Sequence, residues 1–78
     1  MEYDKEKVDD LTLALLYLVM FEEKYGTLAW KGFDWETMNR LHKKGYISNP
    51  IGKQKSVGVS AEGQKIAEEL FKKYCMPD

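Results

Sequence analysis

The stretch from Phe33 to Gly63 (FDWETMNRLHKKGYISNPIGKQKSVGVSAEG) constrains the fold most, because nearly every expected boundary in it has its own sequence signal. Asp34 stands where a helix N-cap is expected, and its carboxylate can accept the free N–H groups of the first turn. Gly45 follows eleven positions later, and glycine commonly ends helices in the left-handed conformation. The sequence therefore predicts a helix over residues 34–44.

A β-hairpin and a last helix are predicted directly after this helix. Apolar residues at period two indicate a hairpin over residues 46–60, with turn-forming residues at its tip and the charges of Lys53 and Lys55 on the tip or the return strand. Ser60 is placed to cap a helix over residues 61–75, which carries apolar residues at helical spacing on one face.

The N-terminal part of the chain predicts a long helix over residues 4–24, which Asp4 can cap. Its apolar residues form three stripes, so that the helix is apolar on all sides, and such helices are normally buried on more than one side. In a chain of 78 residues only one other layer is available to cover it. We therefore expect a homodimer, with Leu13, Leu16 and Met20 at the dimer interface.

The segment between these elements is shorter and less regular. Residues 27–31 alternate loosely between apolar and polar side chains, which suggests a short strand beside the hairpin; a single helical turn is the competing interpretation. The fold class expected is α+β, as a single winged-helix-like domain over residues 1–78 with the order α-β-α-β-β-α.

Charge is distributed unevenly along a chain whose net charge is only −1. Residues 1–30 are net −4, whereas residues 31–55 carry six bases and two acids and are net +4. Concentrated positive charge is the footprint of a nucleic-acid contact surface. The candidate contact residues are Asn39, Arg40, Lys43, Lys44, Lys53 and Lys55. The alternative is a solvated helix face with an ordinary loop tip.

No constellation of residues points to catalysis. The lone Cys75 excludes an internal disulfide, and together with His42 it cannot complete a zinc site. His42 has no partnering nucleophile or carboxylate, and no phosphate-binding loop is present. We expect no enzyme activity, no cofactor, no metal and no small-molecule ligand. The large residues Trp30, Phe33 and Trp35 are interpreted as core or interface anchors.

A membrane location is not expected either. The longest apolar run, Leu13 to Phe21, is far shorter than the ~20 residues of a spanning helix, and no positively charged region precedes it. A cytoplasmic protein is the expectation.

Two resemblances can be stated on these residues. L-H-K-K-G-Y-I at residues 41–47, followed by V-G-V-S-A-E-G at residues 57–63, resembles the end of the recognition helix and the wing in winged-helix regulators of the MarR and PadR type. The whole chain is also similar to a family of small uncharacterised bacterial proteins that carry W-K-G-F-D-W and R-L-H-x-K-G-x-I, here residues 30–35 and 40–47. The first resemblance implies a winged-helix fold and binding to double-stranded DNA.

The chain departs from the winged-helix pattern before the recognition helix. A full helix-turn-helix needs a scaffold helix there, and the segment from Gly26 to Asp34 has room for barely one turn. The helix-turn-helix is therefore expected to be reduced. Two functions follow as hypotheses: a small DNA-binding regulator, or a protein-interaction (dimerisation) module that keeps the fold without binding DNA.

Overall fold

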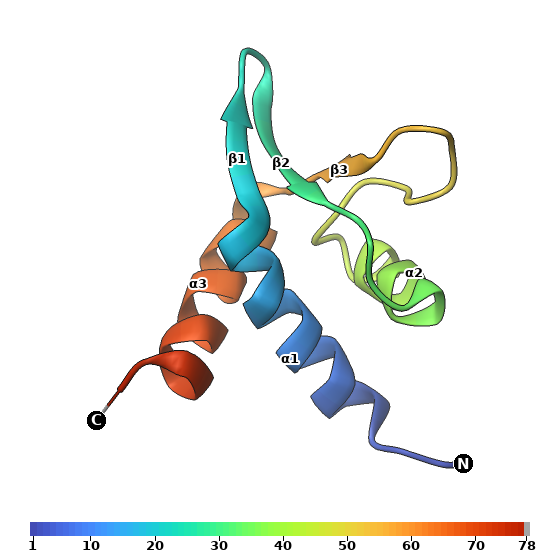
Figure 1. Ribbon diagram of the computed structural model, residues 1–78, viewed down its shortest axis with the longest axis vertical. Helices are drawn as coiled ribbons and strands as arrows, with labels where there is room; N and C mark the ends of the chain where they lie inside the picture. Colours follow the sequence, from blue (N-terminus) through green and yellow to red (C-terminus); the bar gives the residue numbers. More distant parts are fainter. Residues whose placement is uncertain (78) are drawn as a thin grey trace.

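The protein is described here by a computed structural model, which covers residues 1–77. Within them, the chain is α+β, with three α-helices and one three-stranded antiparallel sheet (Figure 1). The elements in chain order are α1 (Lys5–Leu16), the 3₁₀ turn η1 (Tyr17–Val19), β1 (Met20–Glu23), β2 (Gly26–Trp30), α2 (Trp35–Lys43), β3 (Ser56–Gly58) and α3 (Ala61–Cys75). The order is α-β-β-α-β-α, so the predicted α-β-α-β-β-α is wrong in the position of one strand.

The first helix is shorter than the predicted range of residues 4–24. After α1 and η1 the chain extends as β1, which pairs with β2 in a register that runs from Met20↔Ala29 to Glu23↔Gly26. Gly26 has a φ of 147°, a conformation that glycine adopts easily, and it lies where the chain reverses between β1 and β2. The prediction failed because an apolar run fits a helix or a buried strand equally well. Here the pairing with β2 makes residues 20–23 a strand.

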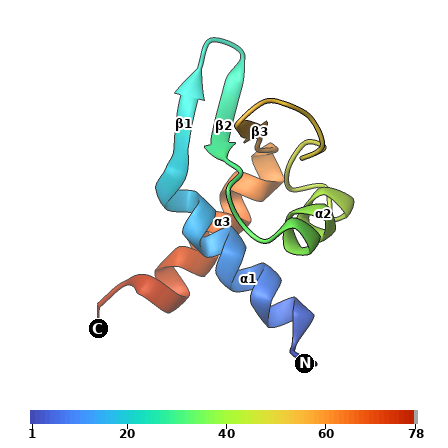
Figure 2. The same ribbon diagram turned by 45° about the vertical axis from the view of Figure 1, so that its right-hand side comes forward.

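The short strand expected near residues 27–31 is confirmed as β2, which lies in the middle of the sheet. The hairpin predicted over residues 46–60 forms only in part. Its second arm is β3, which pairs with β2 from Leu28↔Gly58 to Trp30↔Ser56 (Figure 2). Its first arm contributes a single bridge, Ile47↔Val59. The long loop between the two arms therefore joins the sheet only at its ends.

The two helices that begin within the stretch from Phe33 to Gly63, α2 and α3, start where their N-cap residues predict. The Asp34 carboxylate accepts the N–H of Thr37 at 3.1 Å, and the Ser60 hydroxyl accepts the N–H of Gly63 at 2.9 Å. Gly45 follows α2 with a φ of 84°, in the left-handed region that favours glycine. These local signals agree with the observed bounds of α2 and α3.

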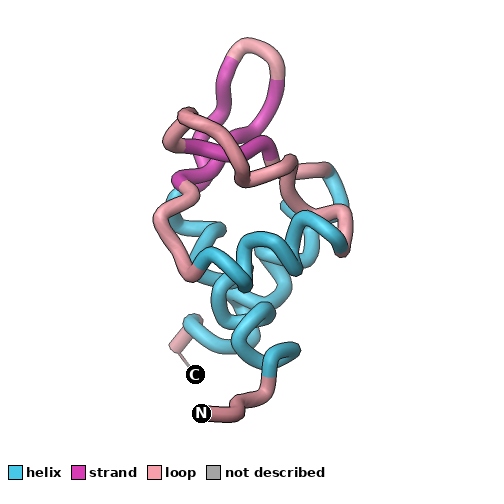
Figure 3. The backbone as a smooth tube through the Cα atoms, turned by 90° about the vertical axis from the view of Figure 1, so that its right-hand side faces the viewer, coloured by secondary structure: helices cyan, strands magenta, loops and turns pink. Residues whose placement is uncertain are grey.

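The core lies where the sheet meets the three helices, and Figure 3 shows the strands at one end of the molecule and the helices at the other. Its buried side chains come from α1, β2, α2, β3, α3 and the segments flanking β3: Leu13, Leu16, Ala29, Met38, Leu41, Ile47, Val57, Val59 and Ala67. The molecule measures 34 × 32 × 18 Å along its principal axes. It is thin in one direction, so much of α1 and of the sheet stays uncovered on one side.

The start of α3 packs directly on the backbone of the segment before it. The N–H of Ser60 donates to the carbonyl of Tyr46 at 3.0 Å, and the Ser60 hydroxyl donates to the carbonyl of Gly45 at 2.7 Å. One turn later Gly63 is buried against the same Tyr46 carbonyl, and a Cβ at this position would overlap that oxygen. Only glycine lets α3 approach so closely.

We predict that G63A destabilises the protein by about 1–3 kcal/mol in urea unfolding, because overpacking outweighs the ~1 kcal/mol that alanine gains inside a helix. G58A is the matched control. A Cβ at Gly58 would meet the Ser48 side chain at 3.6 Å, an ordinary contact, so its unfolding free energy should stay within about 0.5 kcal/mol of wild type. A more stable G63A would show that the close approach is not needed.

Candidate functional site

The basic face of α2 is held against α1 by a buried carboxylate. Asp9 is 1% exposed, and its two oxygens accept from Nε of Arg40 at 2.7 Å and from Nζ of Lys44 at 2.9 Å. Lys44 also donates to the more exposed Glu6 at 2.8 Å. Asp9 is buried because it lies on the same side of α1 as Leu13 and Leu16, and a buried charge requires such partners. We call Glu6, Asp9, Arg40 and Lys44 the ion cluster.

The ion cluster favours the charged forms of its bases. Burial of Lys44 is the largest single influence and opposes its charge, yet the hydrogen bonds and charges of Glu6 and Asp9 together outweigh it and raise the pKa of Lys44. The pKa of Arg40 is raised in the same way, against burial, by its hydrogen bond to Asp9. Because folding raises the pKa of Lys44, the ion pairs of Lys44 stabilise the folded state fully below the ordinary pKa of lysine. This stabilisation of the folded state is lost as the pH rises through the raised pKa.

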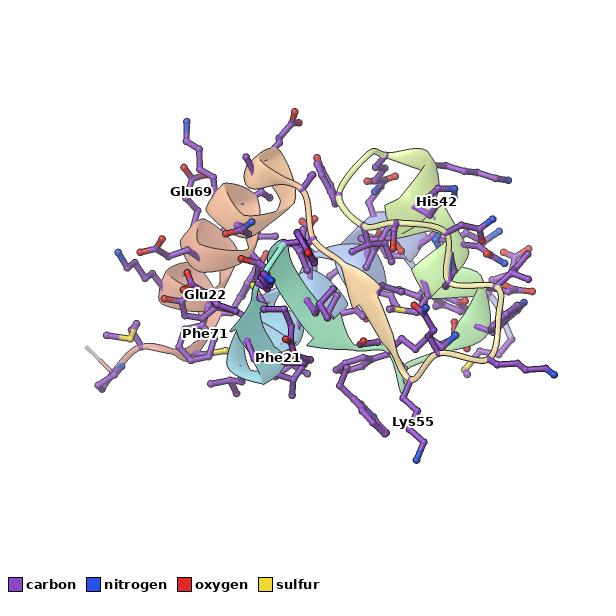
Figure 4. All side chains as sticks on the ribbon, turned by 90° about the horizontal axis from the view of Figure 1, so that it is seen from above. Phe21, Glu22, His42, Lys55, Glu69 and Phe71 are labelled. Carbon is purple, nitrogen blue, oxygen red and sulfur yellow. The ribbon has the colours of Figure 1, made fainter. Side chains whose placement is uncertain are left out.

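The six predicted nucleic-acid residues do not form one free basic surface. Arg40 and Lys44 are committed to the ion cluster, and Asn39 is partly buried beside them. The remaining cations, Lys43, Lys53 and Lys55, are exposed, and none has an ion-pair partner within residues 1–77. Figure 4 shows Lys55 extending away from the body of the molecule. Half of the predicted set therefore remains available to an anion.

The loop that carries Lys53 and Lys55 is held by a third lysine. Nζ of Lys31 donates to the carbonyls of Pro50 at 2.7 Å and Gly52 at 2.9 Å, and Pro50 is buried. Lys31 is thus a structural residue, although it contributed to the positive charge counted along the sequence.

The W-K-G-F-D-W motif forms the connection from β2 to α2. The indole of Trp30 lies over Gly32, where a Cβ would meet its Nε1 at 2.5 Å, and Phe33 packs against the core. Asp34 then caps α2, and hydrogen bonds from the hydroxyl and N–H of Thr37 lower the pKa of its carboxyl. Trp30 and Trp35 are 50% and 54% exposed, so two aromatic rings of the motif face solvent, and of the three predicted anchors only Phe33 packs against the core.

The His42 side chain contacts the backbone of the segment that follows α2. The His42 ring faces the carbonyl of Ile47, with Nδ1 at 3.0 Å from that oxygen, which is a structural contact. Within residues 1–77, no three His, Cys, Asp or Glu side chains gather in a way that could hold a metal ion. In the same part of the chain no helix has the length and apolar character needed to cross a membrane.

The predicted dimer-interface residues differ in how far the chain covers them. Met20 lies on β1, packs against the core and stays partly exposed, so its assignment remains a prediction. Leu13 and Leu16 are fully buried within one chain, so the interface prediction for these two side chains is wrong. They are covered by the other helices and the sheet, a layer that the sequence pattern placed in a second subunit. The opposite side of α1 remains open.

The open side of α1 carries leucines at helical spacing. Leu11 is 39% exposed, Leu15 is 45% exposed and Leu18, in η1, is 64% exposed. Phe21 on β1 is 43% exposed, and it lines one surface hollow with Leu18. α1 passes directly through η1 into β1, so the elements that carry these residues follow one another without a linker (Figure 1). We call Leu11, Leu15, Leu18 and Phe21 the apolar face.

Strand alternation explains why Phe21 points outward. Met20 and its register partner Ala29 face the core, so Phe21 and its partner Leu28 lie on the other side of the sheet. Figure 4 shows Glu22 on the side of β1 near α3 and Phe21 away from it. Phe21 therefore lies on the outward face of the sheet and lines a surface hollow with Leu18 of η1.

Sequence reasoning missed the ion cluster, although one signal for it was present. Asp9, Leu13 and Leu16 have the spacing i, i+4, i+7, so an acid stands in line with residues of the core. A charge on a buried stripe indicates a partner of opposite charge on the element that covers it.

We predict that D9N lowers the free energy of unfolding by about 1–3 kcal/mol, because it leaves Arg40 and Lys44 partly buried without their shared carboxylate. The loss is smaller than for a fully buried pair since both bases retain some contact with water. D10N removes the same charge from a neighbouring residue that has no ion pair within residues 1–77, and it should stay within about 0.5 kcal/mol of wild type. Equal losses for D9N and D10N in urea unfolding would contradict a specific role for the ion cluster.

Comparison with known proteins identifies the family. The chain is similar to the "Uncharacterized protein y4hR" of Sinorhizobium fredii (strain NBRC 101917 / NGR234), with 48% identity over 73 residues, which is 94% of this chain and 95% of the relative. No solved structure matches the chain at a significant level. The family model described as "Domain of unknown function (DUF6429)" matches residues 4–76. The chain therefore belongs to the DUF6429 family of small domains.

Proposed function

We propose that this protein is a protein-interaction module that works by self-association, in which the apolar face of one chain packs on that of a second copy. The observation that supports this most is the row of outward leucines at residues 11, 15 and 18, each more than a third exposed. Isolated exposed apolar residues are ordinary, but a contiguous row across a helix and the adjoining strand is typical of an interaction surface.

The shape of the molecule favours a second copy as the partner. A standard interface buries about 800 Å² on each partner, and the broad side of a 34 × 32 × 18 Å molecule offers room for it. Two equal, flat surfaces can meet about a two-fold axis, which is the commonest symmetry of soluble oligomers. Dimerisation would cover the side of α1 and of the sheet that the thin fold leaves open.

The proposal is tested by the double substitution L15E/L18E, with I51E as the matched control. Ile51 is also a large exposed apolar residue, but it lies in the loop between Ile47 and β3. We expect sedimentation velocity at tens of micromolar to show dimers of the wild type and of I51E and monomers of L15E/L18E, because buried glutamates would lack partners. Far-UV circular dichroism checks that each variant is folded.

Two outcomes would contradict self-association through the apolar face. One is a wild-type chain that remains monomeric at hundreds of micromolar. The other is a dimer that L15E/L18E leaves intact, which would place the interface elsewhere on the molecule.

A second candidate function is the binding of double-stranded DNA by a winged-helix-like arrangement with a reduced helix-turn-helix. The observation in its favour is that Lys43, on α2, and Lys53 and Lys55, on the loop before β3, are exposed without a carboxylate partner in residues 1–77. The commitment of Arg40 and Lys44 to the ion cluster weighs against it, as does the net charge of −1.

DNA binding is tested with mixed genomic fragments at low salt, where electrostatic affinity is largest. If it occurs, K53A/K55A should weaken binding to all sequences and reduce the salt dependence by about two released ions. The control variant K72A/K73A removes two lysines from α3 and should change neither the DNA affinity nor its salt dependence by much. The absence of any mobility shift for the wild type at low salt would exclude this function.

A further inference from the structure

We propose that the protein binds single-stranded nucleic acid at the end of β2, where one base stacks on the indole of Trp30 and the adjacent phosphates pair with Lys53 and Lys55. We call these three residues the stacking site. They lie outside the apolar face, so the proposal does not depend on self-association. It differs from the binding of double-stranded DNA because its main contact is an aromatic ring, which stacks on unpaired bases.

Trp30 presents its ring on the outward face of the sheet. It is the last residue of β2 and follows Ala29, which is completely buried on the core side. Because side chains alternate along a strand, Trp30 lies on the other face, two residues from Leu28. Half of the tryptophan is exposed. A large ring in this position is available to a ligand.

The chain holds this ring in place beside Gly32. The indole nitrogen Nε1 lies so close that a Cβ on Gly32 would stand 2.5 Å from it. The backbone of Trp30 is fixed as well, because Ser56 is its register partner in the sheet. The ring is therefore preorganised, and a base that stacks on it orders little of the protein.

Lys31 ties the loop that carries the two lysines to the same end of β2. Its backbone N–H donates to the carbonyl of Lys55 at 3.1 Å, and its ammonium donates to the carbonyl of Gly52 at 2.9 Å. Lys53 directly follows Gly52 in the chain. The hydrogen bonds of one residue, the neighbour of Trp30, thus keep both loop lysines at this end of the strand.

The two loop lysines are spaced for neighbouring phosphates of one strand. Lys53 and Lys55 are two residues apart, so their Cα atoms are separated by at most about 7 Å. Both side chains are exposed. Figure 4 shows Lys55 on the same side of the molecule as Phe21, which is the outward side of the sheet and the side that Trp30 faces. A base and its phosphates can therefore meet the indole and the lysines together.

The positive charge around the stacking site is not neutralised by paired acids. Lys31, Lys53 and Lys55 have no ion pair within residues 1–77. The loop over residues 49–55 contains these last two lysines and no acid. Phosphates are the anions that such a loop complements.

The acids nearest to the stacking site are engaged elsewhere or lie further away. Asp34 caps α2, and Glu36 lines a surface hollow with the first residues of the chain. On β1, Glu22 faces α3, and Glu23 pairs with the first residue of β2, about 13 Å from its last residue (Figure 4). A broad duplex or a bilayer would meet these acids too, whereas a narrow single strand contacts the stacking site alone.

The first test follows tryptophan fluorescence, which a stacked base quenches. The chain has two tryptophans, so W35F leaves Trp30 as the only one and W30F leaves Trp35. We expect oligothymidine of about 16 nucleotides to quench W35F saturably at about 50 mM salt, where electrostatic affinity is large. The same titration should leave the fluorescence of W30F unchanged.

The second test compares affinities by the fluorescence anisotropy of a labelled oligothymidine. W30L should weaken binding about tenfold or more, whereas W30F keeps a ring and should stay within about threefold of wild type. K53A/K55A should also weaken binding, and it should lower the slope of affinity against salt by about 1.4, at about 0.7 for each phosphate contact on a single strand.

Matched controls remove the same kinds of residue elsewhere. W35L removes a tryptophan of similar exposure that stands at the start of α2, and K72A/K73A removes two lysines from α3. Both variants should bind oligothymidine like the wild type. Far-UV circular dichroism checks that every variant is folded.

Four results would overturn the proposal. They are the absence of saturable quenching of W35F at low salt, quenching of W30F instead, a W30L variant that binds as tightly as wild type, and equal affinity for oligothymidine and for its duplex with oligoadenosine. Equal affinity for the duplex would favour the second candidate function. Binding to vesicles that contain phosphatidylserine, without binding to oligothymidine, would assign the exposed tryptophan and lysines to a membrane surface.

Discussion

The structure depends on one buried carboxylate. Asp9 places two bases of α2 against α1, and the direction of α2 across α1 follows from these two contacts. The same contacts engage Arg40 and Lys44, so two of the three bases of α2 and its C-cap are paired with Asp9, and only Lys43 is left without an ion pair within residues 1–77. The stability of the fold and the charge of α2 are thus set by the same residue, and a substitution at Asp9 changes both.

Local signals were sufficient for α2 and α3 and insufficient for the end of α1 and for the predicted hairpin, of which only β3 and one bridge form. Asp34, Gly45 and Ser60 act on the backbone within a few residues, so the bounds of α2 and α3 could be predicted from sequence. The end of α1 could not, because Met20 and Phe21 are strand residues only through their pairing with Ala29 and Leu28. An apolar run without caps carries no information about that partner.

The sequence indicated which kinds of residue the candidate site contains, but not how they are arranged. The sequence indicated that the first helix has an uncovered apolar side, but it selected Leu13 and Leu16, which the chain itself buries. Which stripe stays open depends on where the other helices pack. Similarly, the pairing of Asp9 with Arg40 joins residues 31 positions apart, and no local pattern specifies it. The similarity to a family of small uncharacterised proteins, by contrast, was inferred from the sequence, and the match of the DUF6429 family model to residues 4–76 identifies the family.

The passage from α1 through a single 3₁₀ turn into β1 has a kinetic consequence. With no flexible linker between helix and strand, the fold holds Leu11, Leu15, Leu18 and Phe21 in a fixed arrangement within one chain. If two chains associate through the apolar face as proposed, binding to this preorganised surface would cost little backbone conformational entropy and would require no folding step. Association would then proceed at the rate of rigid docking, and substitutions on this surface would change the lifetime of the complex.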